Sequence, residues 1–270
     1  MMGLMPGIWI CFVAVMALSA LGGLTGCAPW FLQEEEVSFQ EATLPELLSR
    51  LDQRTAGLMS FKALLDVHVT GSQRFTASLT WMGPQQNQVR GFDRLGRTLF
   101  EMRVAGNLIQ WSVPGRPPVL LGTVESLARS ASIDAGDLSV AVADLVRVTS
   151  ALTGPALGGG EIPMVEKPPG PFYILDGVRM EAGAARLTKR FWIDRQRLRL
   201  VRQEFFHPDG TLDLALHFED FRPTIQGDWP YRLVAQRPGE SRVVELVFRE
   251  VKFNIPIAPE EFRLPEGILP

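Results

Sequence analysis

The segment FKALLDVHVTGSQRFTASLTW, residues 61–81, decides the fold. Apolar residues occupy every second position on both sides of a turn at Gly71-Ser72. These positions are Ala63, Leu65, Val67 and Val69 before the turn and Phe75, Ala77, Leu79 and Trp81 after it. A period of two puts such residues on one face of a strand. The segment therefore predicts two antiparallel strands with one buried face.

The same alternation continues on both sides of a central region that lacks it. Strand-like runs follow at 89–93, 98–104 and 108–113, and a second series occupies 190–194, 199–206, 211–218, 231–236 and 243–253. We therefore expect about ten or eleven strands in a mainly β (α+β) chain. A sheet of that size curls around its apolar face.

Helical spacing occurs near the N-terminus and in the middle of the chain. The sequence Thr43-Leu44-Pro45-Glu46 has the pattern of a capping box and predicts an N-terminal helix of about four turns, ending near Gly57. Residues 123–130 and 137–152 are also predicted to be helical, and we expect the helices to cover the mouth of the curled sheet. The proline- and glycine-rich segment 153–171 predicts a long loop.

Residues 1–26 carry no charged side chain, and Ile8–Leu18 is an unbroken apolar run. This run has the length of a secretory h-region and is shorter than a membrane span of about 17–25 residues. It is followed by Leu24-Thr25-Gly26-Cys27, which resembles the lipobox of bacterial lipoproteins. The resemblance implies that residues 1–26 are removed as a signal peptide and that Cys27 is acylated. The alternative is an uncleaved signal anchor from Ile8 to about Leu24.

The composition of the chain argues against nucleic-acid binding and against a functional thiol in the mature protein. The chain has 27 Lys+Arg against 30 Asp+Glu, a net charge of -3, which excludes the basic excess typical of nucleic-acid-binding proteins. Of its two cysteines, Cys11 lies in the predicted signal peptide and Cys27 is the predicted acyl acceptor. The mature chain then has no thiol for catalysis or a disulfide. Residues 27–42 predict an acidic tether, and 43–270 are expected to form a single domain.

Two parts of the chain resemble the LolA and LolB families of periplasmic lipoprotein carriers. Residues 61–109, which include RFTASLTW at 74–81 and VRGFDRLGRT at 89–98, are similar to LolB. Residues 190–210 and 251–262 are more similar to LolA. The resemblance implies an unclosed antiparallel β-barrel with a helical lid over a hydrophobic cavity.

The resemblance also implies a function. The chain would be a membrane-anchored lipoprotein that binds acyl chains and receives or transfers lipoproteins or lipids in the cell envelope, without a cofactor or metal. Its partners would be the membrane, through acylated Cys27, a lipoprotein or lipid cargo, and a periplasmic carrier protein. We expect a monomer facing the periplasm, with the outer membrane favoured over the inner because Ala28 follows the cysteine. The alternative is a structural or assembly lipoprotein that scaffolds an envelope complex and binds no ligand.

A membrane-transfer loop is implied by the similarity to LolB. That family carries a Pro-Leu-Gly turn whose leucine projects into solvent and is needed for delivery to the membrane. Leu95-Gly96 occupies the corresponding position here, with Arg94 in place of the proline and Arg97 after the turn. The alternative is a plain hairpin turn at 93–96.

The hydrophobic cavity would be lined by inward-facing strand residues. The candidates are Leu65, Val67, Phe75, Leu79, Trp81, Phe100, Met102, Ile109, Trp111, Phe191, Phe205, Leu216 and Phe218. The alternative is that these side chains fill a solid core.

No set of acid, base and nucleophile is evident in the sequence, so no enzyme is predicted. His68, His207 and His217 lack the spacing of metal ligands and are predicted to be surface residues. The arginine-rich segment 186–202 indicates either contacts with lipid phosphates or an acidic partner, or a solvated sheet face.

Overall fold

The computed structural model describes residues 38–71, 74–83, 86–123, 142–154, 156–167, 169–241 and 243–263. The chain divides into two units, Met1–Ser38 and Phe39–Pro270, and the fold described below is that of the second. The predicted signal peptide, Cys27 and residues 28–37 of the tether lie outside the described residues.

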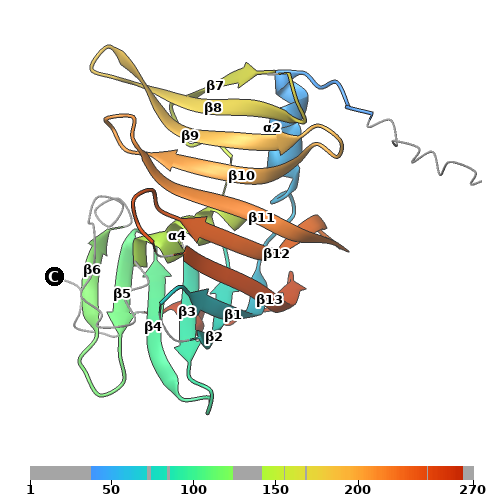
Figure 1. The fold of residues 1–270 in the computed structure, drawn as a ribbon. Coiled ribbons are helices and arrows are strands. Elements are labelled where there is room, and N and C mark those ends of the chain that lie inside the picture. The colour runs from blue at the N-terminus through green and yellow to red at the C-terminus, as the bar shows by residue number, and fades with distance from the viewer. Residues whose placement is uncertain are drawn as a thin grey trace, which may run out of the picture. The chain divides into compact units, whose positions relative to one another are not determined.

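The fold is one antiparallel sheet of thirteen strands. The strands are β1 (Phe61–Val69), β2 (Arg74–Trp81), β3 (Gln86–Phe92), β4 (Thr98–Ala105), β5 (Leu108–Ser112), β6 (Val119–Thr123), β7 (Glu161–Glu166), β8 (Phe172–Glu181), β9 (Ala184–Asp194), β10 (Arg199–Phe206), β11 (Leu212–Thr224), β12 (Gly227–Gln236) and β13 (Val243–Phe253). Their order in space is β6-β5-β4-β3-β2-β1-β13-β12-β11-β10-β9-β8-β7, and Figure 1 shows the ribbon running from β6 to β7 in this way. Because β6 and β7 stand at opposite ends of this order, the barrel is not closed, as the resemblance to the LolA and LolB families implies.

The sheet has more strands than the ten or eleven expected. One reason is that β7 lies within 153–171, which the sequence predicts to be a loop. Pro163 pairs with Gly177 of β8, and its missing N–H is tolerated because β7 is an edge strand. Edge strands bury little of their surface, so β7 lacks the apolar alternation that identifies the inner strands.

Helix α2 (Leu44–Gln53) begins as predicted and packs on β10 (Figure 1). The Glu46 carboxylate accepts a hydrogen bond of 2.7 Å from the Thr43 backbone N–H, which closes the predicted capping box. The helix ends at Gln53, before the predicted four turns are complete. The chain continues as a turn in which the Asp52 carbonyl accepts the N–H groups of Thr55 and Ala56, and this turn ends at Gly57 with a positive φ of 73°.

Helix α4 (Val142–Thr153) is the described part of the predicted lid. Val148, Ala151 and Leu152 of α4 are buried in the same hydrophobic core as the strand residues. The predicted helix 123–130, apart from its first residue, and the beginning of 137–152 lie outside the described residues. A short 3-10 helix, η3 (Pro259–Phe262), buries Phe262.

Burial alternates along the strands as the period of two predicts. In β1 every second residue is buried, from Phe61 to Val69. Aromatic rings fill the inner face nearby: Phe100 stacks on Trp111 at 4.7 Å between ring centroids. Gly91 is needed beneath this stack, since a Cβ there would lie 2.3 Å from Cε1 of Phe100. The inner face of this part of the sheet is therefore filled by side chains.

Candidate functional site

The predicted cavity residues face the interior of the sheet. All of them are buried except Phe205, which is half-buried and has the guanidinium of Arg147 over its ring at 5.7 Å. Leu65, Phe75 and Phe100 line, with Val148 of α4, a gap of only about 20 Å³. That space holds no more than about one water molecule. These residues thus belong to the hydrophobic core or pack against it, and their role in lining a cavity stays a prediction.

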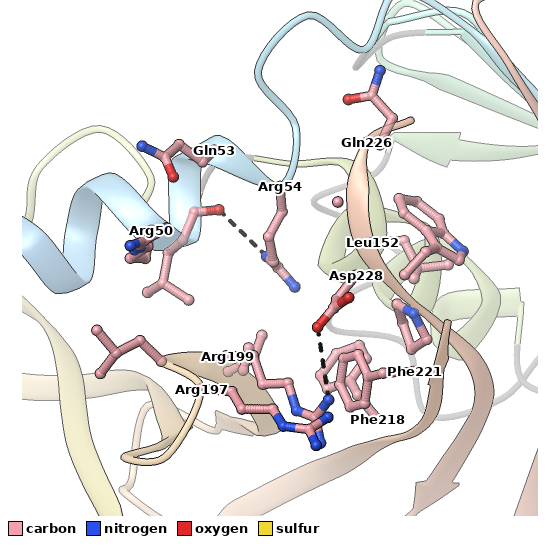
Figure 2. Close-up of a pocket in the computed structure, with 16 residues that line it drawn as sticks. Arg50, Gln53, Arg54, Leu152, Arg197, Arg199, Phe218, Phe221, Gln226 and Asp228 are labelled. Carbon is pink, nitrogen blue, oxygen red and sulfur yellow. Dashed lines mark hydrogen bonds and ion pairs between the residues drawn. The ribbon is translucent and has the colours of Figure 1, made fainter. Parts of the chain in front are cut away.

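A larger pocket, of about 370 Å³, lies beside the C-terminal end of α2 (Figure 2). Its walls come from α2, from Leu152 of α4, from the β9–β10 turn with the start of β10, and from β11 and the β11–β12 hairpin. Of the predicted cavity residues, Phe218 lines it. Other apolar lining residues include Leu51, Leu152, Leu200, Phe221, Trp229 and Pro230.

The charged lining residues of this pocket are strongly unbalanced. Arg50, Arg54, Arg197 and Arg199 line it, whereas Asp228 is the one acidic lining residue. Four guanidinium groups against one carboxylate leave an excess of three positive charges on the lining, and Asp194, outside the lining, partly compensates Arg199. The pocket therefore combines an apolar surface with a positive potential.

Arg199 is fixed by its neighbours. Its Nη1 lies 3.8 Å from Oδ2 of Asp228 and its Nε lies 3.7 Å from Oδ2 of Asp194. The guanidinium also lies over the ring of Phe221, at 4.3 Å from the ring centroid. This stacking holds a cation against the apolar part of the pocket.

Arg54 enters the pocket from the end of α2. Its side chain donates to the carbonyl oxygens of Leu51, at 3.3 Å, and Ala151, at 3.2 Å. Within the described part of the chain it forms no ion pair. Burial lowers the pKa of Arg54 to about 10, so the group remains cationic at neutral pH.

Leu198 lines the same pocket from the β9–β10 turn in an unfavourable backbone conformation. Its φ of 50° lies in the left-handed region, which a branched side chain rarely adopts. Such strain costs about 1 kcal/mol or more and concentrates at functional sites. The turn therefore keeps an apolar side chain at the pocket at the expense of local stability.

The predicted membrane-transfer loop is the turn between β3 and β4. Leu95 is 79% exposed at its tip. The Asp93 carboxylate fixes the turn, since it accepts the N–H groups of Leu95 at 2.8 Å and Arg97 at 2.9 Å and pairs with the Arg97 side chain at 2.6 Å. Gly96 supplies the positive φ of 77° that the turn needs, and Arg94 is exposed. This is a rigid turn with an apolar tip, and its role in membrane delivery stays a prediction.

The arginine-rich segment 186–202 divides into two groups. Most of its cations pair with carboxylates on or beside the sheet, as Arg190 does with Asp176 at 2.7 Å and Arg195 with Glu41 at 3.0 Å. Arg197 and Arg199 reach the pocket, and Arg199 in addition pairs with Asp194 and Asp228.

The three histidines lie apart from one another. His68 lies 3.3 Å from Glu245, and His207 lies 3.3 Å from Asp213, while His217 is half-buried in β11, where burial lowers its pKa. Among the described residues, no cluster of His, Cys, Asp and Glu is suited to hold a metal ion. Nor does any helix in these ranges have both the length and the apolar character needed to cross a membrane.

Known structures share this fold at low sequence identity. A LolA superfamily protein from Nitrosomonas europaea aligns with a TM-score of 0.58 and 14% identity, over 83% of this chain and 99% of its own. The chain has the fold of LolA superfamily proteins. A domain described as an outer membrane lipoprotein-sorting protein from Vibrio parahaemolyticus and a DUF1329 family protein from Desulfovibrio piger each align with a TM-score of 0.55 and 12% identity. Each of these two alignments covers 80% of this chain and 94% of the other. No protein-family model and no curated protein matches the chain.

Several pocket residues were missed by reasoning from the sequence. Phe218 and the segment with Arg197 and Arg199 stood out, but Arg50, Arg54 and the hairpin residues Asp228 and Trp229 did not. These residues come from segments more than 140 positions apart and have no common spacing. Only the three-dimensional fold brings them together.

Proposed function

We propose that this protein binds an acyl chain of a lipid or lipoprotein in the cell envelope, in the pocket beside α2. The observation that carries the proposal is the apolar lining of a pocket of about 370 Å³ in a LolA-like fold. This volume lies in the lower part of the range of about 300–1,000 Å³ for ligand sites. Each methylene buried there contributes about 0.8 kcal/mol, so an acyl chain gains affinity without any catalytic group.

The second part of the proposal is a lipid anchor. The lipobox-like sequence supports acylation of Cys27, removal of residues 1–26 and a tether at 27–42. Ala28 favours the outer membrane, and the similarity of residues 61–109 to LolB favours a LolB-like role at its periplasmic side. Metabolic labelling with a fatty-acid analogue tests the anchor. We expect label on the wild type and on Cys11→Ala, and none on Cys27→Ala. Equal labelling of the wild type and Cys27→Ala contradicts acylation, and an unlabelled chain of full precursor mass supports an uncleaved signal anchor.

The acyl-binding role is tested by the lipids that co-purify with the full chain. Gln226 lies at the rim of the pocket and is half-buried, so Gln226→Trp places a bulky ring in the space that a ligand needs. We expect mass spectrometry to detect an acyl lipid with the wild type and a strong loss of that lipid with the variant. Arg116→Trp, at an exposed turn outside the pocket, serves as the matched control.

One observation favours a second candidate function. Among the described residues, the gap between the inner strand residues and Val148 of α4 measures only about 20 Å³, and such close packing suits a scaffold protein with a solid core. In that case the wild type carries no acyl lipid in the experiment above. Isolation of the same envelope complex with the wild type and with Gln226→Trp then supports the scaffold.

A further inference from the structure

The pocket beside α2 has a charge pattern that acyl binding alone does not need. The apolar lining is sufficient to bind a neutral acyl chain. Cations buried beside such a chain lose hydration, which costs free energy. Here, however, four arginines and one aspartate share the lining. The surplus of positive charge indicates a ligand that brings negative charge with it.

We propose that the pocket recognises the oxyanion head of a single-chain amphiphile, a carboxylate or a phosphate, through Arg54, Arg197 and Arg199. This inference rests on the proposed acyl-binding function and specifies the class of its ligand.

The three guanidinium groups approach one space from two sides. Figure 2 shows Arg54 extending from the end of α2 toward the side on which Arg197 and Arg199 lie next to each other. Phe218 and Phe221 lie beside Arg199 in the same view. An oxyanion placed among the arginines would therefore have its acyl chain next to aromatic rings.

The donors of these groups are not used up by the protein. Arg197 is exposed and makes no hydrogen bond or ion pair with the described part of the chain. Arg54 donates to two backbone carbonyls, and the carboxylate that raises its pKa, Asp52, is exposed and outside the lining. Arg199 lies 3.7 Å from Asp194 and 3.8 Å from Asp228, which is beyond hydrogen-bond distance. Its Nε is buried without a hydrogen-bond acceptor among the described residues, and the same holds for Trp229 Nε1. An oxyanion offers only acceptors and so complements such a surface.

The size of the pocket favours a ligand with one acyl chain. Its volume of about 370 Å³ is small for a ligand with several acyl chains, since ligand sites extend to about 1,000 Å³. A free fatty acid and a lysophospholipid share the chemistry that fits, namely one chain and one oxyanion.

Photo-crosslinking of the full chain in envelope vesicles tests the inference. The probes are a photoactivatable palmitate, its methyl ester and a photoactivatable lysophosphatidic acid, and the readout is adduct formation on peptides of 197–200 and 218–230. We expect one or both acids to label these peptides at least about ten-fold more than the ester, because charge-assisted hydrogen bonds to arginine are lost in the ester. Labelling by palmitate alone assigns a carboxylate ligand, and labelling by the lysophospholipid alone assigns a phosphate.

Variants that remove a single positive charge distinguish an effect on oxyanion recognition from an effect on folding. Arg197→Gln and Arg199→Gln should each lower labelling by the acids about ten-fold while leaving labelling by the ester unchanged. Arg116→Gln removes the same charge at an exposed turn outside the pocket and should change neither. Arg199→Gln also loses the two ion pairs with Asp194 and Asp228, and this loss can prevent folding. In that case the labelling of Arg197→Gln decides the test.

The outcomes distinguish the two proposals. Equal pocket labelling by acid and ester overturns oxyanion recognition and leaves acyl binding standing. Displacement of the acid probes by inorganic phosphate at equal concentration also overturns it, since the site is then one for a simple anion. Absence of pocket adducts with every probe overturns the proposed function itself.

Discussion

Arg237 holds Asp144 through two nitrogens, with Nη2 at 2.5 Å from Oδ1 and Nε at 3.2 Å from Oδ2. Asp144 is in α4, whereas Arg237 follows β12 directly. Arg237 also bonds Asp213 of β11, to which Arg147 of α4 is paired. Both aspartates are buried. These buried ion pairs therefore attach α4 to the start of β11 and to the end of β12.

Loss of Arg237 should loosen this attachment. Arg237→Gln leaves Asp144 buried without its cation, and removal of one partner of a buried pair costs about 3–5 kcal/mol. We expect a decrease of that size in the free energy of unfolding, measured by chemical denaturation. The control is Arg222→Gln, whose pair with Asp220 is exposed and should cost less than about 1 kcal/mol. Equal small losses in both variants would show that the buried pairs do not hold α4.

The backbone of Leu198 should lower the stability of the protein, whereas its side chain should support ligand binding in the pocket. In Leu198→Gly the residue at φ 50° loses its strain, and this gain offsets the apolar contact that is lost. The free energy of unfolding should change by less than about 1 kcal/mol, while labelling of the pocket by acyl probes falls. Leu44→Gly, which removes a half-buried leucine of α2 outside the pocket, should show the reverse pattern. A large loss of stability in Leu198→Gly with normal binding argues against a role in the pocket.

Acid should weaken the attachment of edge strand β7 through Glu161. Burial alone would raise the pKa of this carboxyl, but hydrogen bonds from Gly158 and Thr188 and the charge of Lys189 outweigh it and hold the pKa below its ordinary 4.5. The ionised carboxylate therefore stabilises the fold above pH 4.5, and this contribution is lost as the pH falls through the folded-state pKa.

The measurement is the free energy of unfolding against pH for the wild type and Glu161→Gln. The difference between them should be constant above pH 4.5 and shrink below it. Thr188→Val removes one hydroxyl that donates to Glu161 at 2.8 Å and should give an intermediate pH dependence. Parallel curves for wild type and Glu161→Gln contradict the prediction.

Leu95 should contribute to the transfer of acyl cargo into a membrane and should not contribute to folding. Because its side chain is 79% exposed, Leu95→Glu should leave unfolding and acyl binding unchanged. Burial of one leucine in a bilayer contributes at most about 3 kcal/mol, so transfer of acyl cargo into liposomes should slow by about ten-fold or more.

A second exposed tip provides the control for Leu95. Ile225, in the β11–β12 turn beside the pocket, is 80% exposed. If Ile225→Glu slows transfer and Leu95→Glu does not, the membrane-contacting end of the fold is the pocket end, and the β3–β4 turn is a plain hairpin.

The inner strands could be predicted from the sequence because burial on one face leaves a period of two. The segment from Phe61 to Trp81 forms β1 and β2 with Leu79 opposite Ala63, and the capping box at Thr43 marks the start of α2. The edge strand β7 could not be predicted, because an edge with little burial has no such period. The pocket could not be predicted either, since its shape depends on how the end of α2 meets the β11–β12 hairpin.

The open order of the sheet has a mechanical consequence. The edge strands β6 and β7 stand at opposite ends of the strand order, so among the described residues no strand pairing joins the two edges of the sheet. In a closed barrel, any widening of the interior must break backbone hydrogen bonds along a whole strand pair. Here the two edge strands share no such bonds, and α4 is attached to the sheet by side-chain ion pairs and apolar contacts. Separation of the two edges would thus leave every strand pair and its register intact.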